Sequence, residues 1–466
     1  MIDLTKLTVI SARQALKQGE FTATELTKRS LEVIGEKDAE LHAFLEVFED
    51  ALDQAKVSDE KIASGVDLPL LGIPVAIKDN ILFDGHTASA GSKILEKYRA
   101  TYDSTLIKKL KEAGAIIIGR TNCDEFAMGS STENSAYGTT KNPIDTSRVP
   151  GGSSGGSAVA VSAGMVLASF GSDTGGSIRQ PAAFTGIVGM KPTYGRVSRS
   201  GLIAMASSLD QIGPFTKTVE EAELLYEIAK GRDAMDSTTI SDDTYKLREN
   251  KKVIGVPRSF FESSLDKEVM KNFNNTVDRF KKLGYEVKDI ELPHLKYSLA
   301  VYYILMPAEV SSNLARFDGV KYGLHVDGDN SIDDYFKTRG AGFGREVRRR
   351  VILGTYVLSS GYYDAYYGQA QNMKKAITDE IREAFNNVDV IITPTTPTPA
   401  FKFGEKTDPL SMYLADIFTV PANITGCPSI SIPSGEVNGL PLGLLITADL
   451  GSEEKLFATA KDFEKS

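Results

Sequence analysis

The sequence predicts an α/β protein built on one large mixed β-sheet with helices on both faces. Residues 104–114 have the pattern of an amphipathic helix that stops at a glycine, and the apolar run 115–118 follows at once, which is the helix-then-strand alternation of an α/β sheet. Near the end, the β-rich runs 429–433 and 441–447 are joined across Asn438-Gly439, a dipeptide that favours a tight hairpin. Parallel-type alternation interrupted by a hairpin indicates a mixed sheet.

The first 65 residues are expected to be helical. Thr22 and Glu25 have the spacing of a capping box, which marks the start of a helix. The apolar side chains that follow are spaced for one buried helix face: Leu26, Leu31, Val33 and Ile34. A short β-rich run at 71–81 comes next and ends in polar residues.

Residues 129–215 are unusually dense in glycine, serine and threonine, yet apolar residues stay frequent, as at 158–161 and 166–170. A disordered linker would lack those apolar residues. We therefore expect a folded core with many tight turns in this region.

After Thr218 the alternation of helices and strands resumes. We expect strands at 252–257, 285–292 and 388–393, and helices at 267–283 and over much of 296–317 and 345–385. The whole chain, 1–466, is predicted to be one domain. Its helical N-terminal part is 1–65 and its core 66–220, while 221–466 completes the sheet and supplies helices on the substrate side.

Composition restricts the function. The 466 residues carry a net charge of −9, whereas a protein whose main task is gripping phosphate backbones usually has a basic surplus. The one dense basic run, 345–350, contains Glu346, and its composition alone favours a solvated helix face. Any nucleic acid is therefore expected to be held mainly by a partner. With no long apolar run and no signal-like start, we expect a cytoplasmic protein that binds no membrane.

Three segments carry candidate chemistry: 72–80, 151–157 and 171–180. Gly151–Gly155 matches the G-x-S-x-G turn of α/β-hydrolases, but that turn must follow a strand, and residues 147–150 make a poor one. It also needs a histidine. The four histidines have no motif-like setting: His42, His86, His294 and His325.

Other known sites fit no better. A P-loop needs a lysine after its glycines, and none follows here. Asp173-Thr174-Gly175 resembles half of an aspartic-protease site, which requires two such carboxylates. Neither Cys123 nor Cys427 has a histidine partner nearby in the sequence or the spacing of a metal ligand, so no metal is expected in this chain.

A site made of serines and a lysine remains. Lys78 follows the apolar residues 75–77, and burial there would favour its uncharged amine, which can act as a general base. Glycines around Ser153 and Ser177 let backbone N–H groups approach a substrate closely. A helix is expected at 178–183. The N–H groups before it could form an oxyanion hole, and they belong to Thr174, Gly175, Gly176 and Ser177.

The blocks 72–80 and 151–214 resemble the amidase signature family. This resemblance implies the amidase signature fold and a Ser-Ser-Lys triad. Ser177 would attack an amide, Ser153 would relay the proton, and Lys78 would serve as the base. It also implies a cis peptide bond between Gly152 and Ser153.

Over nearly its full length the chain resembles the glutaminase subunits of tRNA-dependent amidotransferases, notably at 236–238, 316–319, 354–367 and 416–423. The resemblance implies free glutamine as the substrate. Arg349 would then bind its α-carboxylate and Asp416 its α-ammonium, because charges that leave water need partners. Tyr302 is a further match, although Tyr303 adjoins it, and Arg349 also has the simpler reading of a solvated charge.

The same resemblance implies partners, the B and C subunits of such an amidotransferase. Ammonia would pass to the B subunit, which uses ATP and Mg²⁺ and holds most of Glu-tRNA(Gln), and the small C subunit would complete a heterotrimer. This chain would itself need no cofactor. Two rival functions stay open: a free-standing amidase acting on another small amide, and a non-catalytic assembly subunit.

Overall fold

The computed structural model describes residues 2–246, 249, 251–261 and 265–466. In these residues the strands form one 11-stranded sheet in the order β1-β3-β2-β4-β6-β5-β10-β11-β9-β7-β8. Four neighbouring pairs are parallel and the rest antiparallel, so the predicted mixed sheet is confirmed. The strands are β1 Phe44–Val47, β2 Pro74–Lys78, β3 Ile116–Thr121, β4 Ala168–Asp173, β5 Val188–Lys191, β6 Gln211–Thr216, β7 Val253–Val256, β8 Glu286–Asp289, β9 Val390–Pro394, β10 Ser429–Val437 and β11 Leu440–Ala448.

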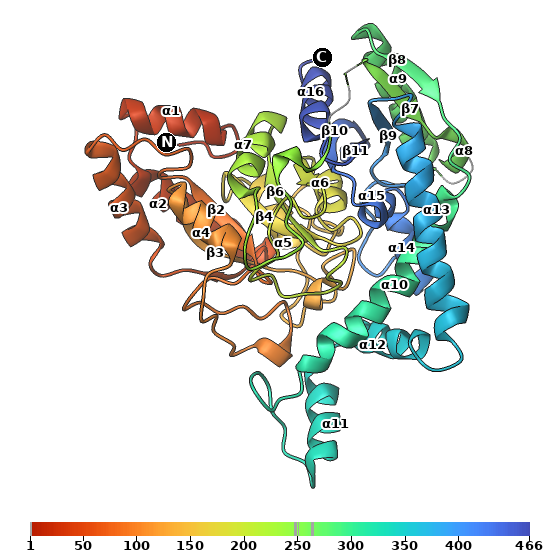
Figure 1. Ribbon diagram of the computed structural model, residues 1–466. Coiled ribbons are helices and arrows are strands. Elements are labelled where there is room, and N and C mark those ends of the chain that lie inside the picture. Colours follow the sequence, from red (N-terminus) through yellow and green to blue (C-terminus); the bar gives the residue numbers. More distant parts are fainter. Residues whose placement is uncertain (1, 247–248, 250, 262–264) are drawn as a thin grey trace.

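Helices surround this sheet (Figure 1). The α-helices of the first half are α1 Val9–Gln18, α2 Ala23–Leu41, α3 Ala51–Ala63, α4 Thr105–Glu112, α5 Gly155–Ser162, α6 Arg179–Thr185 and α7 Val219–Ala229. Those of the second half are α8 Arg258–Phe261, α9 Lys267–Lys282, α10 Ser298–Asn313, α11 Ser331–Gly342, α12 Arg345–Val357, α13 Gln369–Ala384, α14 Pro409–Tyr413, α15 Val420–Thr425 and α16 Glu453–Glu464. The chain begins at one end of the molecule with α1 to α3, reaches the opposite end with β7, β8 and α9, and returns toward the middle with the C-terminal helix α16 (Figure 1).

The N-terminal helix signal is confirmed in detail. Thr22 caps α2, its hydroxyl accepts a hydrogen bond from the Glu25 N–H, and the Glu25 carboxylate accepts one from the Thr22 N–H. The expectation that residues 1–65 are wholly helical is wrong, because β1 lies among them. This strand has only four residues and pairs antiparallel with β3 at the edge of the sheet, too short for its pattern to stand out between helices.

The predicted hairpin is also confirmed. β10 and β11 pair antiparallel, and the turn between them has φ of 51° at Asn438 and 76° at Gly439. Two successive positive φ angles belong to the type I′ turn that Asn-Gly favours. The hairpin inserts into the middle of the sheet, where β10 pairs with β5 and β11 with β9.

The parallel pairing of β2 with β4 positions the candidate site. Ile77 lies opposite Phe170, so the two strands end at the same edge of the sheet, one at Lys78 and the other at Asp173. Side chains beyond the carboxyl ends of parallel strands meet at one edge, which is where α/β proteins commonly bind ligands. Within the described residues, no helix combines the length and the apolar character needed to cross a membrane.

Candidate active site

Lys78 is the last residue of β2, and its side chain is fully buried. Its Nζ donates hydrogen bonds to Ser153 Oγ at 2.7 Å and to Ser172 Oγ at 3.0 Å. Burial lowers the pKa of Lys78 to about 8, against the opposing effect of nearby acidic groups such as Asp124 and Asp173. At pH 7 roughly a tenth of this amine is therefore neutral, and the neutral amine is the form that a general base requires.

Ser153 lies in a tight turn directly before α5, and the Gly152–Ser153 peptide bond is cis, as expected. Gly152 is needed there, because a Cβ atom would clash with the Asp124 carboxylate and would lie 2.6 Å from the Ser131 N. The turn is held from both sides. The Gly152 N–H donates to Gln180 Oε1 at 2.9 Å, and the Asp124 N–H donates to the Ser153 carbonyl at 3.2 Å.

Ser177 lies two residues before α6, and 8% of its surface is exposed. Its carbonyl accepts a hydrogen bond from the Ser154 N–H at 3.2 Å, which joins the segments of the two candidate serines. Among the described residues, no hydrogen bond links the Ser153 and Ser177 hydroxyls themselves. The structure thus brings Lys78 and Ser153 into direct contact and places Ser177 on the adjoining segment.

The loop 173–177 is fixed by the Asp173 carboxylate. Asp173 pairs with Arg179 at 2.8 Å in a fully buried ion pair, and Asn423 Nδ2 donates to it at 2.9 Å. It also accepts the N–H of Gly176 at 2.9 Å, which removes Gly176 from the N–H groups expected to form the oxyanion hole. Elsewhere in the loop, the N–H groups of Thr174, Gly175 and Ser177 have no acceptor in the described part of the chain.

Asp210 supports this loop from the side, a role that no sequence pattern indicated. Thr174 Oγ1 donates to Asp210 Oδ1 at 2.6 Å, and the same carboxylate accepts the N–H groups of Met205 at 2.9 Å and Ala206 at 3.2 Å. Asp210 is buried, and burial raises its pKa to about 6. A lone aspartate 36 positions from its partner has no spacing that reveals this contact.

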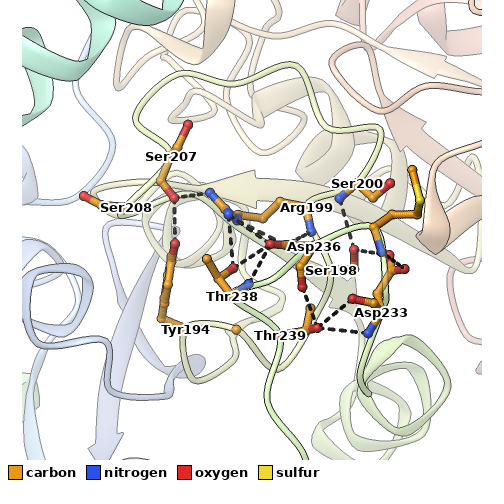
Figure 2. A network of polar contacts seen from close by, with 12 residues as sticks. Tyr194, Ser198, Arg199, Ser200, Ser207, Ser208, Asp233, Asp236, Thr238 and Thr239 are labelled. Carbon is orange, nitrogen blue, oxygen red and sulfur yellow. Dashed lines mark hydrogen bonds and ion pairs between the residues drawn. The ribbon is translucent and has the colours of Figure 1, made fainter.

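The loop before Asp210 is in turn held by a polar network (Figure 2). Arg199 donates to both oxygens of Asp236 and to the Ser207 carbonyl, and the Tyr194 hydroxyl donates to that carbonyl at 2.8 Å. Thr238 donates to Asp236 as well, at 2.7 Å from its hydroxyl. The segment 236–238 is one of those that resemble the amidotransferase subunits. It holds Arg199, which in turn holds the loop before Asp210, so it supports the site indirectly.

Tyr302 is buried on α10 beside the loop 173–177. A Cβ atom built on Gly175 would lie 2.7 Å from the Tyr302 hydroxyl, so a glycine is required at 175. Its neighbour Tyr303 instead stacks on Tyr413, with ring centroids 3.7 Å apart. Of the two tyrosines, Tyr302 is the one against the loop that carries Ser177.

Arg349 and Asp416 are not in contact. Arg349 forms an ion pair with Glu346 and lines a polar cavity of about 220 Å³ together with its neighbour Arg350. Asp416 is buried, accepts a hydrogen bond from the Ser130 hydroxyl, and has no partner for Oδ1 among the described residues. Burial raises the pKa of Asp416 to about 7, while the charge of Arg350 opposes that rise.

Arg350 is thus the buried arginine of this cavity. Its Nε donates to Glu346 Oε1 at 2.8 Å, and its guanidinium lies over the rings of Tyr303 and Tyr413 at 5.7 and 5.8 Å. From the sequence, Arg349 is the arginine expected to bind substrate. Three consecutive arginines point in directions about 100° apart on a helix, and only the packing of α12 decides which one faces inward.

The structure also argues against a nucleophilic cysteine and against a catalytic histidine at this site. Burial raises the pKa of both cysteine thiols, which opposes a thiolate nucleophile. The histidines are engaged elsewhere: His42 at the end of α2, His86 against Phe83, His294 with Glu380 and His325 with Asp327. No group of three or more metal-ligating side chains is arranged to hold a metal ion in the part of the chain that the structure describes.

A family model described as Amidase matches residues 25–457. The chain belongs to the amidase family. The matched region contains every candidate residue of the site, from Lys78 through Ser153 and Ser177 to Asp416. The family match therefore includes the segments that build the serine–lysine arrangement.

Within the amidase family, this chain is most usefully compared with three similar proteins. It is 50% identical over 473 residues to the A subunit of glutamyl-tRNA(Gln) amidotransferase from Desulfatibacillum aliphaticivorans, a match that covers 99% of this chain and 98% of that protein. The crystal structure of a protein of the same name from Thermotoga maritima has a TM-score of 0.84 and 44% identity, covering 100% of this chain and 96% of that one. A peptide amidase from Stenotrophomonas maltophilia has a TM-score of 0.83 at 29% identity, covering 99% and 96%.

Proposed function

We propose that this chain is the glutaminase subunit of a glutamyl-tRNA(Gln) amidotransferase. It would hydrolyse the side-chain amide of free glutamine and supply the ammonia that converts Glu-tRNA(Gln) to Gln-tRNA(Gln). The observation that carries the proposal is the buried Lys78 amine in hydrogen-bond contact with Ser153, one segment away from Ser177. The chain is 50% and 51% identical, over 99% of its length, to two proteins named as the A subunit of this enzyme. This similarity supports glutamine as the amide substrate.

In the proposed reaction, the Ser177 hydroxyl attacks the amide carbon of glutamine. Its proton passes to Ser153 as Ser153 gives its own proton to the neutral Lys78 amine. In this proposal the N–H groups of Thr174, Gly175 and Ser177, which have no acceptor among the described residues, stabilise the resulting oxyanion. The proton then returns through Ser153 to the amide nitrogen, the carbon–nitrogen bond breaks, and ammonia leaves a glutamyl ester on Ser177. Water cleaves this ester and releases glutamate.

Glutamine would be held by its charged backbone groups at the inner end of the cavity that α12 forms with residues 406–413. Asp416 does not line this cavity but follows three residues after Tyr413, which does. The unpartnered Oδ1 of Asp416 suits the α-ammonium, and the arginines of α12 suit the α-carboxylate. Burial distinguishes the two arginines: Arg350 is already enclosed by tyrosines, whereas Arg349 is about one third exposed and would exchange its ion pair with Glu346 for the carboxylate of a ligand. We assign binding of the α-carboxylate to Arg349. The positive charge of Arg350 would favour the ionised form of Asp416. Tyr302 would form the wall of the site near the reacting amide.

A role within a larger assembly also fits the acidic charge of the chain, because a partner would supply most contacts to tRNA. In this proposal Glu-tRNA(Gln), ATP and Mg²⁺ are held by the B subunit, and the C subunit joins the two larger chains. The complex works in the cytoplasm, where tRNA is charged. The free-standing amidase remains the second candidate, since solved amidases at about 30% identity share the fold.

Trapping the acyl intermediate tests the mechanism. Wild-type protein mixed with radiolabelled glutamine and quenched in acid should retain a label that hydroxylamine releases as the glutamyl hydroxamate. Ser177→Ala should retain none, since the ester has no oxygen to form on. Ser162→Ala is the control. Ser162 is the last residue of α5, its hydroxyl donates to the carbonyl of Thr185 at the end of α6, and this variant should label as wild type does. Equal labelling of Ser177→Ala and wild type would overturn the assignment.

A further inference from the structure

The helix α11 extends away from the sheet at the end of the molecule where α12 lies (Figure 1). It presents large apolar side chains to solvent: Ile332 is 68% exposed and Phe336 76% exposed. On α12, Ile352 is 70% exposed. Scattered apolar residues are ordinary on protein surfaces, but several that are this exposed and adjoin one another mark an interaction site.

These side chains form the walls of one groove. Ile332, Tyr335 and Phe336 line it from α11, and Val351 and Ile352 line it from α12, enclosing a cavity of about 600 Å³. Their positions, i, i+3 and i+4 on the first helix, place them on a single helix face. Such a groove between two helices suits the apolar face of a third helix.

The charges of the groove indicate what binds it. Both charged residues that line it are arginines, Arg339 and Arg348, and its lining contains no carboxylate among the described residues. Arg339 donates to the carbonyls of Leu314 and Phe317, while Arg348 is exposed and forms no ion pair in the described part of the chain. A second copy docked symmetrically would bring these arginines toward their own equivalents, which repel. An occupant with carboxylates beside its apolar side chains is complementary instead.

We propose that the groove between α11 and α12 binds an amphipathic, acidic segment of a partner protein within the amidotransferase. This inference rests on the proposed function, which makes the chain one part of an assembly. Apolar side chains of the segment would fill the cavity around Phe336 and Ile352, and its carboxylates would face Arg339 and Arg348.

Docking here bears on the candidate active site because α12 is shared. One side of this helix lines the groove, and another side carries Arg349 and Arg350 into the polar cavity. At the start of the helix, the Gly344 N–H donates to Glu125 Oε2 at 2.8 Å, and the neighbouring Asp124 supports the Ser153 turn. A segment bound in the groove therefore contacts the helix that positions the proposed glutamine ligands.

The test uses the full chain co-expressed with the B and C subunits from the same organism. The double variant Phe336→Asp, Ile352→Glu should bind these partners at least about tenfold more weakly by size-exclusion chromatography with light scattering, since buried apolar anchors dominate such interfaces. Met235→Asp is the matched control, because Met235 is 77% exposed but lies outside the groove, and it should assemble as wild type does. Melting temperature and glutaminase activity of the isolated chains should match wild type, which separates assembly from folding and catalysis.

Three results would overturn the inference. The double variant could assemble normally; a photocrosslinker at position 336 could fail to capture either partner in the purified complex; or wild type alone could dimerise in a way that the double variant abolishes. If wild type itself does not assemble with the two partners, the proposed function fails and the inference with it. Normal assembly of both wild type and the double variant contradicts the groove alone.

Discussion

At the residue scale, the candidate site depends on one lysine that the fold buries away from solvent. Lys78 is fully buried, and its close polar partners are the hydroxyls of Ser153 and Ser172. Asn80 Nδ2 also donates to Ser172 Oγ at 2.9 Å, which fixes the hydroxyl that Lys78 contacts. Desolvation disfavours the ammonium form, and neutral hydroxyl partners do little to restore it. The pKa of Lys78 consequently falls toward the range in which an amine can accept protons.

This pKa leads to a pH dependence. A buried lysine whose pKa is about 8 gains its neutral, active form as pH rises. We expect kcat for glutamine to increase about tenfold per pH unit below that value and to level off above it. The measurement is kcat at saturating glutamine from about pH 5 to about pH 9, because Asp416 acts on glutamine binding and its titration appears mainly in KM.

Lys217 offers a matched control for that profile. Burial lowers its pKa to about 8 as well, but its amine donates to the carbonyls of Leu4 and Leu7, away from the candidate site. Lys217→Gln should keep the acidic limb of the profile. A kcat that stays level throughout the acidic range in wild type, or an acidic limb that disappears in Lys217→Gln, would contradict the role given to Lys78.

At the element scale, the hairpin and most strands outside residues 129–216 were predicted from the sequence. The strands β1, β4, β5 and β6 and the loops of the site were not. Asn438 and Gly439 determine the hairpin turn through their own backbone preferences. Thr22 and Glu25 likewise determine the start of α2 through a local capping box. The support of Thr174 by Asp210 depends on two segments meeting in space, so no local pattern indicates it. α11 was not predicted for a related reason: its apolar residues are exposed and are spaced for a groove instead of the core.

The contact between Thr174 and Asp210 can be tested at the scale of the loop. Thr174→Val keeps the shape but loses the hydroxyl, so the loop 173–177 should lose its lateral support and kcat should fall about 10–100-fold with little change in KM. Thr174→Ser retains the donor and should recover most of the activity. Thermal melts would show that both variants are folded. Wild-type kcat in Thr174→Val, or equal losses in the two variants, would refute the positioning role.

At the scale of the whole molecule, two independent observations support a glutaminase subunit: similarity to the A subunits over nearly the whole chain, and the contact between Lys78 and Ser153 in the candidate site. The relatives named as the A subunit match over nearly all of this chain, including α10 to α13, where the polar cavity and the exposed groove lie. Sequence reasoning alone excluded histidine and cysteine sites but did not decide which serine attacks. The resemblance supplied that order, and the contacts of Lys78 and Ser153 fit it.

Reconstituted transamidation tests the central claim most directly. The chain, assembled with the B and C subunits, is given Glu-tRNA(Gln), ATP and Mg²⁺, and Gln-tRNA(Gln) is measured with either glutamine or ammonium chloride as the nitrogen source. We expect wild type to use both sources. Ser177→Ala should lose glutamine-dependent product but keep ammonium-dependent product, because only ammonia production needs Ser177. Glutamine-dependent product that persists in Ser177→Ala, or a wild-type assembly that uses ammonium but never glutamine, would contradict the account.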